Sequence, residues 1–262
     1  MTATQRVNAG IETGFRSMRF VASIILAVAS CGVAAAGAVH LDFEDEEETS
    51  MNARVQLDRP ADPDTIRRDC TAARNGRCSQ RFEVYSSPTH VTHGAYRAEA
   101  HTLRARDLRY CVGSSTKLRF SLMMSEGWRS VRRGMTASIL QFKRTQHPPD
   151  AFIAIRDSRL VLRVGREYLG VLLEKLPRDQ WLDVVLEVNW SVDSTGQIEV
   201  SIKRPDGHLL SRLKYAGPTM RNTDGYGYMK WGTYKPDWED QPGVESIVWF
   251  DEMLLVVKES CA

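Results

Sequence analysis

Residues 182–190 read LDVVLEVNW, residues 193–196 read DSTG, and residues 197–203 read QIEVSIK. In both outer runs apolar side chains alternate with polar ones, the pattern of a β-strand that buries one face. The Asp-Ser-Thr-Gly sequence between them is typical of a turn. The segment therefore predicts an antiparallel hairpin, and it sets the expectation for the rest of the chain.

Eight further short runs of alternating or β-branched residues are separated by turn signals such as Ser86-Ser87-Pro88 and Pro205-Asp206-Gly207. They cover residues 81–85, 96–101, 117–123, 137–143, 152–156, 160–164, 226–234 and 246–257. No convincing amphipathic helix follows the N-terminal region. We therefore predict one all-β domain over residues 37–262, a two-sheet antiparallel β-sandwich or jelly roll. Residues 58–80, rich in Pro, Asp, Arg and Cys, are predicted to form a loop or excursion at its rim.

The first 36 residues have the features of a secretory signal peptide. A basic residue, Arg19, precedes the apolar run of residues 21–28, and small residues 34–36 end the segment. The run is shorter than the roughly 20 residues of a membrane-spanning helix. We predict export of a chain with no membrane span, and residues 1–17 are interpreted as a possible upstream extension. The sequence Val28-Ala29-Ser30-Cys31 also resembles a lipobox, which would instead leave a periplasmic or surface form anchored by lipid at Cys31.

Export makes the remaining cysteines informative. Cys70, Cys78, Cys111 and Cys261 form an even set, which in an oxidising compartment indicates disulfides. Four cysteines allow three pairings. We favour Cys70 with Cys78, which would close one polar loop, and Cys111 with Cys261, which would tie down the C-terminal strand. Metal binding is the weaker interpretation, because no C-x-x-C sequence occurs.

The formal net charge of the whole chain is +2. The predicted signal contributes all of it, so the exported chain is close to neutral, and six of its acidic residues lie in the single run 42–48. The remainder is net basic, which suits a local cationic groove for an acidic chain molecule and not bulk electrostatic adhesion, and we expect no nucleic-acid partner. An ordinary surface of mixed charge explains the same composition equally well.

Polar residues recur at every second position in three of the predicted strands, so each set shares one face of its strand. The sets are His93, Arg97, Glu99 and His101; Gln141 and Lys143; and Tyr228, Lys230, Gly232 and Tyr234. An ordinary solvated face explains any one of them. All three together supply the hydrogen-bond donors that an acidic sugar requires.

These strands also carry a resemblance to known enzymes. The sequence Arg97-Ala98-Glu99-Ala100-His101 resembles the R-x-E-x-R strand of the alginate-lyase-like and heparin-lyase-like jelly rolls. The sequence Gln141-Phe142-Lys143 resembles their Q-x-H strand, and residues 228–234, YMKWGTY, resemble their Y-x-K-x-G-x-Y strand. The resemblance implies a concanavalin-like β-jelly roll and a polysaccharide lyase. The chain departs from the pattern at His101, where the family has Arg, and at Lys143, where it has His.

The resemblance also implies roles for these residues. Gln141 and Arg97, with Lys143 as a further candidate, would bind the carboxylate of a uronic acid and stabilise the enolate of a β-elimination. Tyr234 would move the proton as base, acid or both, with the positive charge of Lys230 on the same strand face. Glu99 would orient Arg97, and Tyr228 would line the substrate groove. His101 or His93 would supply the imidazole that Lys143 replaces; the alternative is that Tyr234 acts alone.

The likeness is strongest to the heparin lyase I and glucuronan lyase branch, through residues 230–235 and Trp190-Ser191. We therefore favour an unsulfated, glucuronan-like polymer as substrate and expect a monomeric enzyme. No cofactor is required for the reaction. Jelly rolls of this kind often carry a structural Ca²⁺ near their terminal strands, which makes Asp42, Glu44 and Asp251 candidate ligands, although a solvated acidic edge is favoured.

Two other functions fit the same fold. A glycoside hydrolase would need two suitably separated carboxylates, and no E-x-D-x-x-E strand occurs in the sequence. A lectin-like carbohydrate-binding protein would keep the groove without the chemistry, and the two altered motif positions keep this alternative open.

Overall fold

A computed structural model describes residues 37–46, 54–60, 62–128, 134–145, 147–165, 167–236 and 245–261. The predicted signal peptide and the alternative lipid-anchored Cys31 lie outside these ranges. Within them, no helix has the length and apolar character needed to span a bilayer.

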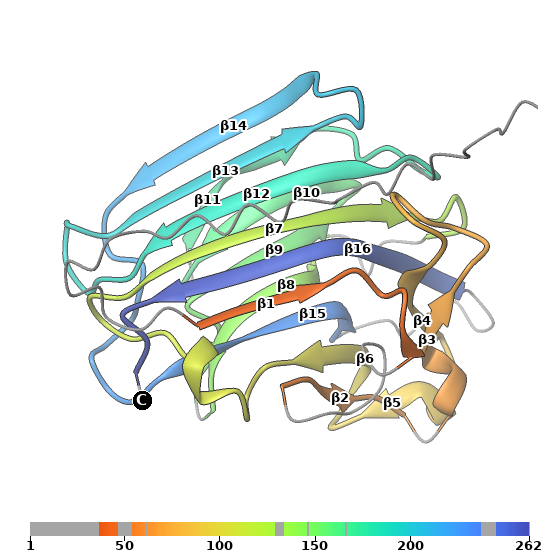
Figure 1. Ribbon diagram of the computed structural model, residues 1–262, viewed down its shortest axis with the longest axis horizontal. Helices are drawn as coiled ribbons and strands as arrows, with labels where there is room; N and C mark the ends of the chain where they lie inside the picture. Colours follow the sequence, from red (N-terminus) through yellow and green to blue (C-terminus); the bar gives the residue numbers. More distant parts are fainter. Residues whose placement is uncertain are drawn as a thin grey trace, which may run out of the picture. The chain divides into compact units, whose positions relative to one another are not determined.

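Two antiparallel sheets form the described domain (Figure 1). The first has the order β14 (Leu209–Ala216), β13 (Gln197–Lys203), β12 (Leu182–Asn189), β7 (Ser115–Met124), β16 (Glu245–Lys258), β4 (Ser79–Tyr85) and β3 (Ile66–Asp69), with β1 (Gly37–Leu41) also paired to β16. The second has the order β11 (Glu167–Leu173), β10 (Arg159–Val164), β9 (Ala151–Arg156), β8 (Ala137–Arg144), β15 (Gly227–Lys235), β6 (Ala95–His101) and β2 (Gln56–Asp58), with β5 (Val91–Thr92) also paired to β6. Three short 3₁₀ helices complete the order: η1 (Pro63–Thr65), η2 (Pro88–His90) and η3 (Arg106–Leu108).

The predicted fold class is confirmed, and all ten predicted strands are present. The hairpin of β12 and β13 pairs Asn189 with Gln197 and continues to Asp183 opposite Lys203, as its alternation requires. The interpretation of residues 58–80 as a loop was wrong in part. Asp58 is the last residue of β2. Farther along, β3 pairs with β4 at the edge of the first sheet, and this pairing lets Ile66 bury its side chain in the core.

An aromatic cluster joins the inner faces of the two sheets. The rings of Tyr110 and Trp190 stack with their centroids 4.0 Å apart, and Phe142 on β8 meets Trp190 edge to face. Trp231 on β15 is fully buried and donates from Nε1 to the side-chain oxygen of Gln80 on β4 at 2.8 Å. Such contacts combine area burial with a satisfied polar tip. They fix which face of β8 and β15 is inside, and hence which side chains face out.

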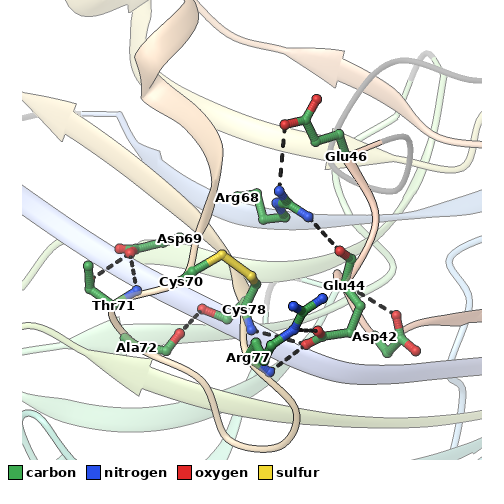
Figure 2. The surroundings of a disulfide bond; sticks show 11 residues. Asp42, Glu44, Glu46, Arg68, Asp69, Cys70, Thr71, Ala72, Arg77 and Cys78 are labelled. Atoms are coloured by element: carbon green, nitrogen blue, oxygen red, sulfur yellow. Dashed lines mark hydrogen bonds and ion pairs between the residues drawn. A yellow bond between two sulfur atoms is a disulfide. The ribbon is translucent and has the colours of Figure 1, made fainter.

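Both favoured disulfides are present, Cys70 with Cys78 and Cys111 with Cys261. Figure 2 shows the first of them. The Cys70–Cys78 disulfide closes a polar loop, and the side chain of Glu44 points into that loop. The Glu44 carboxylate accepts the backbone N–H groups of Arg77 at 2.7 Å and Cys78 at 3.0 Å. These two hydrogen bonds hold the pKa of Glu44 below its usual value. Glu44 thus anchors the disulfide loop.

Candidate functional site

Four neighbouring strands, β8, β15, β6 and β2, carry the candidate site on the outer face of the second sheet. Pairing places Lys230 between Gln141 and His101, and places Tyr234 beside Arg97. The intervening residues Ala98, Ala100 and Trp231 point into the core and are fully buried. The shared parity expected for Arg97, Glu99, His101, Gln141, Lys143, Lys230 and Tyr234 therefore corresponds to one shared face.

A cavity of about 530 Å³ opens on this face. Its lining includes six of the expected residues and part of the chain between β8 and β9. The six are Arg97, Glu99, Gln141, Lys143, Lys230 and Tyr234; His147, Pro148, Pro149 and Phe152 form much of the remaining wall. Within the described ranges, His93, His101 and Tyr228 are not part of that lining.

Glu99 is the centre of a buried hydrogen-bond network. Its side chain is only 3% exposed. One oxygen accepts from Gln141 Nε2 at 2.7 Å, and the other accepts from Lys230 Nζ at 2.7 Å and lies 3.3 Å from Arg97 Nε. A buried carboxylate with this many donors orients them at fixed positions. Glu99 therefore holds three expected site residues at once, and not Arg97 alone.

A second acid, Asp58, enters the site from the edge strand β2. Its Oδ2 accepts from Arg97 Nη1 at 2.9 Å and from Lys230 Nζ at 3.0 Å. Burial works against ionisation, but the charges of Lys230 and Arg97 prevail and lower the pKa of Asp58. The same contacts with Glu99 and Asp58 raise the pKa of Lys230 despite its burial. Sequence reasoning missed Asp58 because a three-residue strand carries too little alternation to be recognised.

Gly232 lies between Lys230 and Tyr234 at the point where β15 shifts register against β8. Its φ of 124° is in the region that favours glycine. A Cβ here would lie 2.3 Å from the carbonyl oxygen of Ala98 and 2.7 Å from the ring of Phe82. Only glycine fits at this position, so close packing around the site explains the glycine of the Y-x-K-x-G-x-Y pattern.

Tyr234 is half-buried, and Arg97 covers its ring. The guanidinium carbon lies 4.8 Å from the ring centroid, within the range of a cation–π contact. The Lys230 ammonium is instead committed to Glu99 and Asp58. The cation in direct contact with the phenol ring is thus Arg97, where the sequence suggested Lys230.

The two candidate histidines have different surroundings. His101 stands edge-on to Tyr228 with ring centroids 5.8 Å apart, and its Nδ1 is buried without a hydrogen-bond partner. The prediction that His93 lies on a strand and shares a face with Arg97 was wrong. His93 and Gly94 form the turn between β5 and β6, with φ values of 50° and 75°. Its side chain is 75% exposed, and Nε2 lies 3.8 Å from Asp58.

We predict that the His101 imidazole titrates with a pKa of about 4, because burial and then the charge of Lys230 disfavour its protonation. The folded-state pKa lies below the value of 6.5 expected in an unfolded chain. His101 therefore contributes stability above that value, and the contribution is lost as pH falls through the folded-state pKa. An NMR titration of the imidazole measures this directly. A midpoint near 6.5 would contradict the buried, neutral histidine described here.

Lys143 and Tyr228 form the end of the site nearest the chain between β8 and β9. Lys143 Nζ donates to the carbonyl of His147 at 3.0 Å, and burial followed by the charge of Lys230 lowers its pKa. Tyr228 is 6% exposed, and burial raises the pKa of its phenol. The fully buried ion pair of Arg144 and Asp150, at 2.7 Å, anchors both ends of this wall.

The proposed Ca²⁺ ligands do not converge. Asp251 accepts backbone N–H groups of Arg74, at 2.7 Å, and Glu252, at 2.8 Å. Glu44 is occupied by the disulfide loop, and Asp42 accepts the N–H of Glu44 (Figure 2). The described residues contain no group of three or more His, Cys, Asp or Glu side chains that could hold a metal ion. The three carboxylates accept backbone N–H groups instead, and a structural Ca²⁺ stays a prediction.

Comparison with known proteins places this geometry in context. A family model described as polysaccharide lyase matches residues 44–254. No curated protein matches the chain. Among solved structures, an endo-β-1,4-glucuronan lyase from the fungus Trichoderma reesei has a TM-score of 0.54 at 19% identity, covering 73% of this chain and 86% of that one.

Two further structures show the same fold. An alginate lyase of polysaccharide lyase family 7 has a TM-score of 0.56 at 12% identity, covering 78% of this chain and 94% of that one. The catalytic domain of a family 131 β-glucanase from Podospora anserina has a TM-score of 0.59 at 13% identity, covering 85% and 90%. At these identities the structural likeness establishes a shared jelly-roll fold.

Proposed function

Because the chain belongs to the polysaccharide lyase family, we propose that it cleaves a uronic-acid polymer by β-elimination at the cavity on β8, β15 and β6. The observation that carries this proposal is the convergence of Arg97, Gln141, Lys230 and Tyr234 around one opening. They are donors and a phenol, the groups that this chemistry requires.

The first requirement is neutralisation of the uronate carboxylate, since the proton on C5 is otherwise only weakly acidic. Arg97 and Gln141 are held by Glu99 and line the cavity. Donors fixed in this way stabilise negative charge without reorganising during the reaction. Lys143, on the same strand face as Gln141, supplies further positive charge when protonated.

The second requirement is proton transfer at the sugar ring. Tyr234 takes the proton from C5, the electron pair of the C5–H bond forms the C4=C5 double bond, and the C4–O4 bond breaks. A proton delivered to O4 completes the cleavage, leaving a new reducing end and an unsaturated uronate. Tyr234 is suited to both transfers because it lines the cavity beside Arg97. His101 as an additional base belongs to the same proposal, and turnover of His101→Ala and His93→Ala close to wild type would remove histidine from it.

An unsulfated polyglucuronate is the substrate that we favour. The support is the motif at residues 230–235 and the fold shared with a protein described as an endo-β-1,4-glucuronan lyase. We also propose that the enzyme is exported and acts as a monomer. Its two disulfides support an oxidising destination.

A panel of polymers tests this proposal. We expect the purified protein to generate the ultraviolet absorbance of unsaturated uronates from polyglucuronate, with less or none from alginate and heparin. A neutral β-glucan serves as the negative control. Binding of uronans without any rise in absorbance would instead identify a lectin-like protein, and new reducing ends without absorbance would identify hydrolysis.

A further inference from the structure

We propose that Asp58 is a specificity-determining residue: its carboxylate competes with the substrate for Arg97 and Lys230, and so excludes polymers that carry sulfate beside the uronate. The proposal rests on the proposed function, because it concerns the same site. It starts from an acid that no motif of the sequence analysis contains.

The contacts of Asp58 are those expected of a bound carboxylate. A single oxygen, Oδ2, accepts from Arg97 Nη1 at 2.9 Å and from Lys230 Nζ at 3.0 Å. The other oxygen lies 3.8 Å from Nε2 of His93. A uronate that binds the cations of this site meets donors that are already engaged by an internal carboxylate, and must share or displace it.

Glu99 also contacts both cations, so each of them keeps one acidic partner when Asp58 is replaced. Glu99, on the central strand β6, lies 2.7 Å from Lys230 Nζ and 3.3 Å from Arg97 Nε. Its side chain is 3% exposed, whereas that of Asp58 is 17% exposed and belongs to a three-residue strand at the sheet edge. Asp58 is therefore the more exposed of the two acids, and it lies at the edge of the site, beside the cavity lining to which Glu99 belongs.

The charges set how many anionic groups the site tolerates. Asp58 contacts both Arg97 and Lys230, and its lowered pKa keeps it ionised at neutral pH, whereas burial raises the pKa of Glu99. Lys143 remains as the cation of the lining that no carboxylate contacts within the described residues, and its pKa is itself lowered. Such a site suits one carboxylate per sugar. An adjacent sulfate meets like charge on Asp58 in a partly desolvated position, where repulsion is strong.

The experiment compares Asp58→Asn with wild type on polyglucuronate and on a chemically sulfated form of the same polymer. Equilibrium dissociation constants and kcat/KM are measured for both polymers. We expect the preference for the unsulfated polymer, expressed as a ratio of affinities, to fall by about tenfold in the variant. Asp64→Asn, which removes the same charge from an exposed position on η1, should leave the ratio unchanged.

Three outcomes would overturn the proposal. An unchanged ratio with a lowered kcat would make Asp58 a positioning residue for Arg97 and Lys230. A ratio that shifts equally in Asp64→Asn would reflect total charge alone. Failure of both Asp58→Asn and Asp58→Ser to fold would assign Asp58 a structural role. The binding ratio does not need turnover, so a wild type that cleaves no uronan refutes the proposed function while the role of Asp58 is still decided.

Discussion

The Tyr234→Phe variant is expected to lower kcat on polyglucuronate by about 10³-fold, within the range measured for loss of a general acid–base group. Phe keeps the aromatic ring beneath Arg97, whose guanidinium carbon lies 4.8 Å from the ring centroid, and removes only the hydroxyl. Since binding groups stay in place, KM should change little. Steady-state kinetics by unsaturated-uronate absorbance give both constants.

A matched control separates this effect from the loss of any tyrosine hydroxyl. Tyr215 lies on β14 in the opposite sheet and donates to the carbonyl of Pro218 at 3.2 Å. Tyr215→Phe should retain the kcat of the wild type. A Tyr234→Phe enzyme within a few-fold of wild type would show that the phenol does not carry the proton.

The Lys230→Met variant is expected to lower the free energy of unfolding by about 3–5 kcal/mol and to abolish most activity. Lys230 is 6% exposed on its side chain and joins two carboxylates, so its loss leaves Glu99 buried beside one fewer cation. Because the pKa of Lys230 is raised in the folded protein, its contribution to the free energy of unfolding is complete at neutral pH. That contribution is lost only as the pH rises through the folded-state pKa of Lys230. Chemical denaturation at neutral pH measures the difference.

Two comparisons identify the cause of that loss. Lys230→Met with Glu99→Gln removes both charges, and should recover part of the stability without restoring activity. Lys117→Met breaks the exposed pair with Glu187, whose side chains are 45% and 50% exposed, and should cost about 1 kcal/mol or less. Equal losses for Lys230→Met and Lys117→Met would refute the buried network.

The fold was predictable because alternation is strong in long strands. The run at residues 182–190 predicts its own hairpin, and the outward face of β15 follows from the same period. The short edge strands β2 and β5 were not predictable, because two or three residues are too few to show an alternation of apolar and polar side chains. The same limit hid Asp58 and placed His93 on a strand, where the structure has a two-residue turn with positive φ.

The central network was only partly predictable. Shared parity put Arg97, Gln141 and Lys230 on outward faces, but parity within a strand does not say which strands are neighbours. Strand order decides that Glu99 receives donors from β8 and β15 together. It also decides that Arg97, not Lys230, covers Tyr234.

A crystal structure of Tyr234→Phe soaked with a glucuronate oligosaccharide tests the site most directly. The account predicts one uronate whose carboxylate contacts Arg97 and Gln141 and whose C5 faces the ring at position 234. A sugar bound only on the opposite sheet, or one whose carboxylate touches neither donor, would contradict it.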